Sequence, residues 1–180
     1  MMTIANAYVG IDPGSQGAVA VIRRNGSATV MDMPSLDEVV NNLYRSIVRM
    51  PEGYYSVAIE SVHPLPGQSC KATFSYGQNF LLAKVIGKCY NINPELVTPQ
   101  RWKNFFGLKR EKGESKTLFK HKSIAKAKEI FPELSSILLA SKDGRAEALL
   151  IAVYKCCTDT GISLEQFCAN KQGENDEQIL

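Results

Sequence analysis

The chain has 180 residues, a formal net charge of +3 and an ordinary share of apolar and charged residues. This length favours one domain with a sizeable core, and no apolar run approaches the roughly 20 residues of a membrane span. The N-terminus shows no signal-peptide pattern, and the five cysteines lack CxxC spacing. We therefore expect a cytoplasmic protein with reduced thiols and no membrane contact, rather than a zinc or disulfide scaffold.

Positive charge is concentrated in residues 101–128, which hold ten Lys or Arg against two Glu, a local net charge of +8 (10 − 2). Such a segment in a near-neutral protein suggests contact with a polyanion, although a solvated helix face is the alternative. The chain end is acidic. We expect a domain over 1–160 and a flexible acidic tail over 161–180.

The first half of the chain predicts three strands followed by a helix. An apolar run ends at Asp12, before a Pro-Gly turn, and Asn25-Gly26 is a strong hairpin signal between residues 17–23 and 28–33. These strands predict an antiparallel meander. Ser35 to Glu38 fits a capping box that opens an amphipathic helix ending before Pro51.

A fourth strand over 54–59 ends in Glu60, as the first ends in Asp12. The helix between the third and fourth strands predicts a crossover, and hence a mixed sheet with helices on its faces. Thr98-Pro99 is a good start for a short helix that contains Trp102. The other predicted elements are a helix over 72–91, a strand at 96–97, a mobile loop over 108–116, a basic helix over 117–131 and a core helix over 144–157.

Four carboxylates occupy positions at which a ligand-binding or catalytic site is expected. If the strands ending in Asp12 and Glu60 are parallel neighbours, both side chains meet at the edge of the sheet where ligands bind. Asp143 and Glu147 share one helix face at a spacing of i,i+4. Three simpler readings are that Asp12 only organises its turn, that Asp143 is a helix N-cap, and that Glu60 pairs with a lysine.

Converging carboxylates without cations would be strongly destabilising, and divalent ions remove that problem. Mg²⁺ prefers carboxylate and water oxygens. Two such ions about 4 Å apart can activate water and stabilise the leaving oxygen in phosphodiester cleavage. The four carboxylates therefore predict a metal site.

Several motifs in this order resemble RuvC-like Holliday junction resolvases over residues 7–157. They are Ile11-Asp12-Pro13-Gly14, Val57-Ala58-Ile59-Glu60, Val97-Thr98-Pro99, Lys122-Ser123 before Phe131-Pro132, and Arg145-Ala146-Glu147-Ala148-Leu149. Residues 62–68 and 74–77 look most like the phage-encoded branch, which would place the protein in a bacterial host's cytoplasm. The resemblance implies an α/β, RNase H-like fold, a five-stranded mixed β-sheet flanked by α-helices.

The resemblance also implies a homodimer that nicks four-way DNA junctions with Mg²⁺ or Mn²⁺, two ions per active site, in recombination and repair. Carried over, Asp12, Glu60 and Glu147 match metal ligands. Family members carry a carboxylate or His three residues before the last ligand, where this chain has Gly144, so Asp143 is assigned as the fourth ligand. Lys122 matches a catalytic lysine near the scissile phosphate.

The basic residues complete this picture. His63 stands near the place of a family aromatic residue that acts at the strand crossover. The other residues expected to contact the DNA backbone are Arg101, Lys103, Lys109, Arg110, Lys112, Lys116 and Lys120. Such contacts give salt-dependent affinity without sequence information. We expect Trp102 to be a core or dimer residue rather than a base-stacking platform.

The leading hypothesis is a crossover junction endodeoxyribonuclease, a metal-dependent hydrolase of branched DNA. An actin-like ATPase or phosphotransferase also begins with Asp before a Gly-rich turn, but the chain is short and lacks a second such hairpin. A non-catalytic module that binds branched DNA is the third possibility, and it predicts binding without cleavage.

Overall fold

The computed structural model describes residues 5–14, 16–39, 55–61, 63, 67–89 and 93–176. Of the helix predicted before Pro51, residues 36–39 are helical and the rest lies outside the described residues. Most of the loop over 62–68 lies outside them too. No helix among the described residues is long and apolar enough to cross a membrane.

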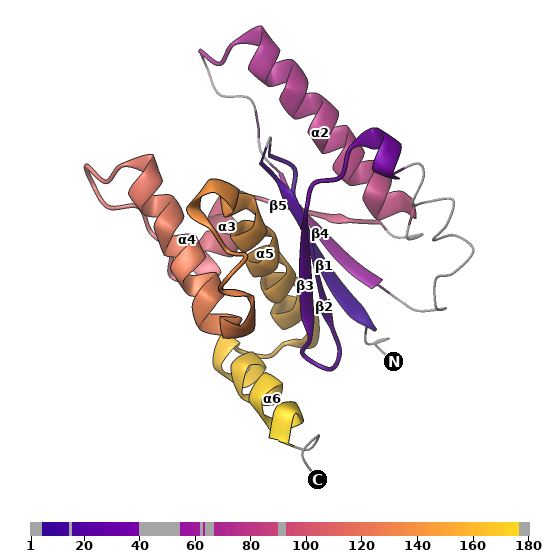
Figure 1. The fold of residues 1–180 in the computed structure, drawn as a ribbon, viewed down its shortest axis with the longest axis vertical. Helices are drawn as coiled ribbons and strands as arrows, with labels where there is room; N and C mark the ends of the chain where they lie inside the picture. The colour runs from indigo at the N-terminus through magenta and orange to yellow at the C-terminus, as the bar shows by residue number, and fades with distance from the viewer. Residues whose placement is uncertain are drawn as a thin grey trace.

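The sheet has five strands in the order β3-β2-β1-β4-β5 (Figure 1). They are β1 (Ala7–Asp12), β2 (Ala18–Arg23), β3 (Ala28–Asp32), β4 (Tyr55–Glu60) and β5 (Glu95–Val97). β1, β2 and β3 form the predicted antiparallel meander, and β4 and β5 run parallel to β1. The predicted mixed sheet is confirmed.

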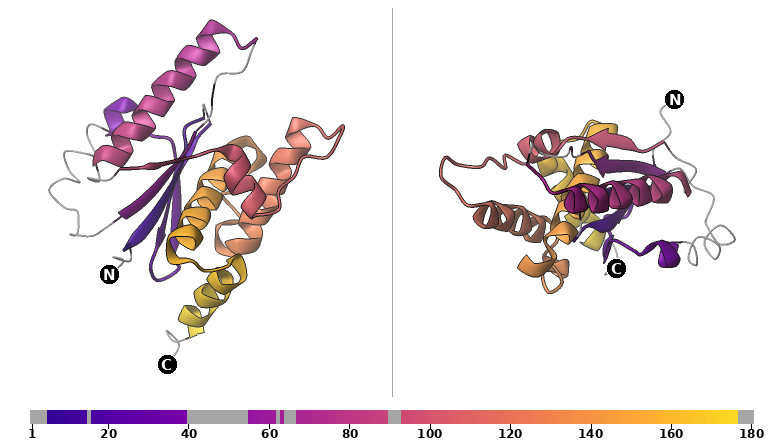
Figure 2. Two further views of the ribbon diagram at one scale, coloured as in Figure 1. Left: turned by 180° about the vertical axis from the view of Figure 1, so that it is seen from behind. Right: turned by 90° about the horizontal axis from the view of Figure 1, so that it is seen from above.

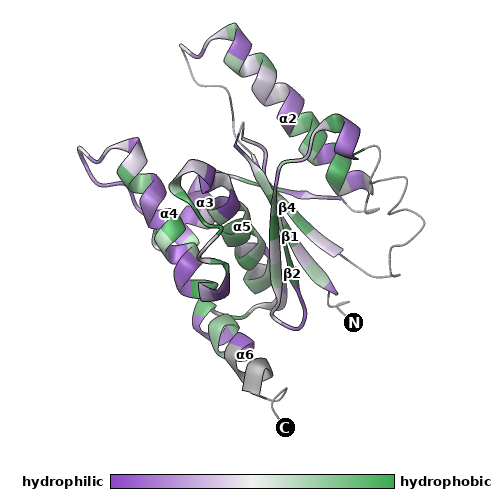
Figure 3. Ribbon diagram, viewed as in Figure 1, coloured by the Kyte–Doolittle hydropathy of each residue, from purple (hydrophilic) through white to green (hydrophobic). Residues whose placement is uncertain are grey.

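Helices cover both faces of the sheet (Figures 1 and 2). α2 (Cys70–Cys89) lies on one face, and α3 (Pro99–Phe105), α4 (Lys116–Ile130) and α5 (Asp143–Thr160) lie on the other. Thr98 caps α3 as predicted, because its side chain accepts from the Arg101 N–H. α5 is the apolar centre of its layer in Figure 3, and its residues 148–153 are buried.

Each face of the sheet packs against its own hydrophobic core. Val9 and Ile11 point towards α2, where they pack with Val57, Ala83 and Ile86. Side chains alternate along a strand, so Tyr8, Gly10 and Asp12 point to the α5 side instead. A Cβ on Gly10 would lie 2.2 Å from the Ala148 carbonyl oxygen, so only glycine lets the backbones of β1 and α5 approach this closely.

Much of the segment that we expected to be a tail is helical. Residues Leu164–Asp176 form helix α6, which packs beyond the end of α5 (Figure 1). Phe167 is buried edge-on against Phe131, and Lys171 forms an ion pair with Glu133 at 2.7 Å. Phe167, together with the partly buried Leu164 and Cys168, thus anchors this helix to the core. The division into a domain over 1–160 and a separate tail stays a prediction.

Candidate active site

Asp12 and Glu60 end two parallel neighbours in the sheet. The register pairs Gly10 with Ala58 and Ile11 with Ile59, so both carboxylates follow at the same edge and on the α5 face. Asp12 is 8% exposed and Glu60 is 5% exposed. The Gly14 N–H donates to Asp12 Oδ1 at 2.9 Å. The predicted meeting of these two strand ends is therefore present.

Burial and mutual repulsion disturb both carboxyl groups. The pKa of Asp12 is raised to about 7, mainly by burial and next by the charge of Glu147. Burial, then the charges of Asp12 and Glu147, raises the pKa of Glu60 to about 8. Removing a carboxylate from water disfavours its charged form, and a like charge nearby adds to the cost. The three acids thus share one electrostatic environment although they lie far apart in sequence.

The first turn of α5 brings the other two carboxylates to this edge. Asp143 is buried and is the first residue of α5, so the N-cap position belongs to Lys142 rather than to Asp143. The charge of Asp143 also raises the pKa of Asp12. The N-terminus of α5 therefore adds Asp143 and Glu147 to the site that already contains Asp12 and Glu60.

Close packing explains why glycine stands three residues before Glu147. A Cβ on Gly144 would lie 2.0 Å from the Gln16 carbonyl oxygen and 2.9 Å from Asp12 Oδ2. Even the smallest side chain would push α5 away from the turn after β1. A carboxylate cannot occupy this position here, whereas Asp143 lies beside it.

Two lysines that we expected to line the DNA backbone contact these acids. Lys103 Nζ lies 3.2 Å from Glu147 Oε1, and Lys120 Nζ lies 2.5 Å from Asp143 Oδ2. The side chain of Lys103 is 18% exposed and that of Lys120 is 54% exposed. The two salt bridges place positive charge on the carboxylates that α5 supplies.

Trp102 has a polar role that the sequence analysis missed. Its indole Nε1–H donates to Glu60 Oε1 at 2.9 Å, and the residue is fully buried. The expectation of a core residue is met, and the ring also orients the second strand-end acid. A signal was available, because a buried tryptophan N–H usually finds a partner and Glu60 needed one.

Lys122 lies in a different environment from the four acids. Its Nζ donates to Glu114 Oε2 at 3.0 Å and to the Lys109 carbonyl oxygen at 3.1 Å. The Glu114 side chain is only 3% exposed, and its backbone carbonyl oxygen accepts two hydrogen bonds from Arg110. The loop that we expected to be mobile is thus folded around Glu114. A catalytic role for Lys122 stays a prediction.

The remaining residues predicted to bind DNA are exposed. Arg101 forms a 3.5 Å ion pair with Glu95 and keeps 62% of its side chain exposed. The other exposed members are His63, Lys109, Arg110, Lys112 and Lys116. Their side chains are therefore accessible from solvent.

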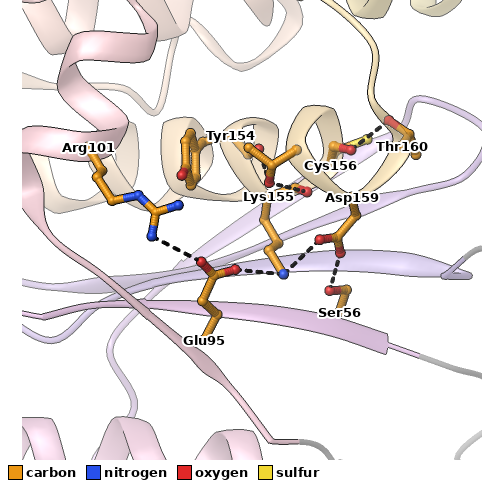
Figure 4. A network of polar contacts seen from close by, with 9 residues as sticks. Ser56, Glu95, Arg101, Tyr154, Lys155, Cys156, Asp159 and Thr160 are labelled. Atoms are coloured by element: carbon orange, nitrogen blue, oxygen red, sulfur yellow. Dashed lines mark hydrogen bonds and ion pairs between the residues drawn. The ribbon is translucent and has the colours of Figure 1, made fainter.

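A second polar network lies at the other end of α5 (Figure 4). Lys155 Nζ donates to Glu95 Oε2 at 2.8 Å and to Asp159 Oδ1 at 2.7 Å. Asp159 Oδ2 accepts from the Ser56 hydroxyl at the start of β4. This network joins α5 to β4 and β5 away from the strand ends that carry Asp12 and Glu60.

The donor chemistry fits a hard divalent cation. Carboxylate oxygens are the ligands that Mg²⁺ prefers, and Asp12 and Glu60 carry a burial cost that a cation would offset. Yet no group of three or more His, Cys, Asp or Glu is arranged to hold a metal ion in the described part of the chain. Lysine amines hold Asp143 and Glu147 instead. The two-ion site therefore stays a prediction.

No protein-family model matches this sequence, and no curated protein matches it. Among solved structures, T. thermophilus RuvC in complex with a Holliday junction substrate is similar, with a TM-score of 0.50 and 15% sequence identity. The match covers 86% of this chain and 96% of that one. At this identity the likeness shows the fold, a RuvC-type, RNase H-like five-stranded mixed sheet with flanking helices. The predicted fold class is confirmed, whereas the phage-type branch stays a prediction.

Proposed function

We propose that this protein is a divalent-metal-dependent endonuclease that hydrolyses phosphodiester bonds in branched DNA, with four-way junctions as its main substrate. One observation carries the proposal: four acids from β1, β4 and α5 gather at the carboxyl edge of an RNase H-like sheet. The solved neighbour of the same fold is a protein in complex with a Holliday junction. The acids give hydrolysis a chemical basis, and the neighbour suggests the substrate.

Asp12, Glu60, Asp143 and Glu147 are the residues that would hold Mg²⁺ or Mn²⁺. The bound cations would supply an activated water and would stabilise the leaving oxygen. Trp102 holds the Glu60 carboxylate through its indole N–H, and the Gly14 N–H holds Asp12. These contacts fix two of the acids before any substrate arrives.

The exposed basic residues of 101–116 would follow the DNA backbone. Phosphate contacts of this kind fix the position of the duplex but carry no sequence information. Affinity should therefore fall steeply with salt for any junction sequence.

A second copy of the chain is the proposed protein partner. Phe74, Leu81 and Val85 share one face of α2 and are 69%, 63% and 37% exposed. Leu36, which is 61% exposed, lines the same hollow as Leu81 and Val85. Large apolar side chains gathered in this way mark an interaction surface. A dimer would supply two active sites for the two strands of a junction.

A cleavage assay tests the proposal. Purified protein in excess is incubated with a labelled four-way junction, or with linear duplex of the same sequence, in Mg²⁺, in Mn²⁺ and in EDTA. We expect nicking of the junction with either metal and none in EDTA. Asp12→Asn should bind the junction without cutting it, and exposed Asp37→Asn should cut normally. A junction that stays intact with both metals would overturn the proposal.

A non-catalytic junction-binding module is the second candidate. The pairing of Lys103 with Glu147 and of Lys120 with Asp143 favours it, because both acids already have a counter-charge. It predicts junction binding without cleavage, and binding that Asp12→Asn does not change. The same assay therefore separates the two candidates.

A further inference from the structure

Lys103 is held in the acidic site more firmly than a DNA-contact lysine would be. Its amine lies 3.2 Å from Glu147 Oε1, 4.7 Å from the centre of the Trp102 ring and 5.5 Å from the centre of the Phe119 ring. Only 18% of its side chain is exposed. A cation above two aromatic faces is favourable, and more so where water is excluded. The amine is therefore held in place by surrounding side chains and does not extend freely into solvent.

The charge of Lys103 acts on more than Glu147. It opposes the rise in the pKa of both Asp12 and Glu60. One ammonium thus acts on three carboxylates from a largely buried position. Lys120, which is half-exposed, pairs with Asp143, and the charges of Glu147 and Asp12 also raise its pKa. Lys103 performs in part the electrostatic task that a divalent cation would perform.

We propose that Lys103 is the resident counter-ion of the acidic cluster: it stabilises the metal-free fold and, by repelling a second cation, weakens the affinity of the cluster for Mg²⁺. This inference rests on the proposed function, because it concerns the same site. The physical reason is that like charges a few ångströms apart in a partly buried site repel strongly. A lysine that only touched DNA would leave Mg²⁺ affinity unchanged.

The single tryptophan provides the measurement. Trp102 donates to Glu60, so any cation that binds Glu60 changes the surroundings of the indole. Mg²⁺ is titrated into the full-length protein at about pH 8.5, above the raised pKa values of Asp12 and Glu60, so that protons compete little with the metal. Tryptophan fluorescence follows the titration.

Lys103→Met removes the charge and keeps a flexible apolar stem over the two rings. We expect this variant to bind Mg²⁺ about tenfold more tightly than wild type, an effect typical of a nearby charge at a partly buried site. Lys103→Arg keeps the charge and should restore affinity close to that of wild type. In EDTA, Lys103→Met should melt at a lower temperature, and saturating Mg²⁺ should abolish the difference.

Lys155→Met is the matched control. Lys155 is 12% exposed and also contacts two carboxylates, but it belongs to the network in Figure 4 at the other end of α5. Its removal should lower the melting temperature equally with and without Mg²⁺ and leave Mg²⁺ affinity unchanged. The comparison separates a counter-ion of the site from a lysine that only stabilises the fold.

The outcomes distinguish the two proposals. If neither wild type nor Lys103→Met shows a saturable response to Mg²⁺, the proposed metal-dependent function fails. If wild type responds and Lys103→Met binds Mg²⁺ equally or more weakly, the function stands and the counter-ion role of Lys103 is overturned. Tighter binding by Lys103→Met, with affinity restored in Lys103→Arg, supports the role.

Discussion

The indole N–H of Trp102 donates to the Glu60 carboxylate over 2.9 Å, inside the core that α3 and α5 build against the sheet. This contact ties a short helix to the end of β4. It also favours the charged form of Glu60 and so opposes part of the rise in pKa that burial causes. The aromatic core and the acidic site are thus directly linked through this hydrogen bond.

Trp102→Phe should therefore damage both stability and the site. The lost hydrogen bond and the lost volume together should lower the free energy of unfolding by about 2–4 kcal/mol, measured by urea unfolding followed by circular dichroism. Mg²⁺ affinity, measured by calorimetry, should also fall. Phe106→Leu is the control, because buried Phe106 lies in the same core. If both variants keep wild-type Mg²⁺ affinity, Trp102 does not orient Glu60.

The metal-free protein should lose stability as the pH rises from about 5 to about 9. The pKa is raised to about 7 for Asp12 and to about 8 for Glu60, whereas the same groups in the unfolded chain are ionised by about pH 5. The folded state therefore binds more protons than the unfolded state in this interval, and the free energy of unfolding falls with pH. Urea unfolding in EDTA at several pH values measures this slope.

Asp12→Asn should reduce that slope and should stabilise the metal-free protein at pH 9, because it removes one buried charge. Exposed Asp37→Asn should leave the slope as it is. A wild-type protein that grows more stable between pH 6 and pH 9 in EDTA would contradict the burial of these acids.

Two helical glycines should respond in opposite ways to alanine. Gly144→Ala places a Cβ 2.0 Å from the Gln16 carbonyl oxygen, so we expect it to destabilise the protein by about 1–3 kcal/mol and to weaken Mg²⁺ binding. Gly77 in α2 has open space around its Cβ position, so Gly77→Ala should stabilise the protein by about 0.5–1 kcal/mol. Thermal unfolding of both variants checks the pair, and equal effects would show that α5 is not pressed against the turn after β1.

Leu81→Glu should prevent the proposed dimer. A charge in the centre of the apolar face of α2 cannot be buried against a second copy without a large desolvation cost. Analytical ultracentrifugation of wild type should show a dimer, and the variant should be a monomer with wild-type circular dichroism. Thr117→Glu changes an exposed residue on α4 and serves as the control. A wild-type protein that sediments as a monomer at high concentration would refute the dimer.

The sequence by itself determined the order of the five strands, the helices α2 to α5 and the edge of the sheet at which Asp12 and Glu60 end, but not helix α6. Alternation in strands, helical periodicity, the Asn25-Gly26 turn and the Thr98-Pro99 start are local signals, and each records a short-range preference of the backbone. The helix expected between the third and fourth strands predicted a mixed sheet. The parallel pairing of β1 with β4 was decided by the tertiary structure.

The partners of the acids were decided only by the tertiary structure. Nothing local distinguishes Lys103, which contacts Glu147, from Lys122, which contacts Glu114, because both lie in one basic segment. Their roles depend on which side of α3 or α4 faces α5, and on the approach that Gly144 permits. Long-range packing fixes those distances, and electrostatic energy depends on distance and burial rather than on position in the chain.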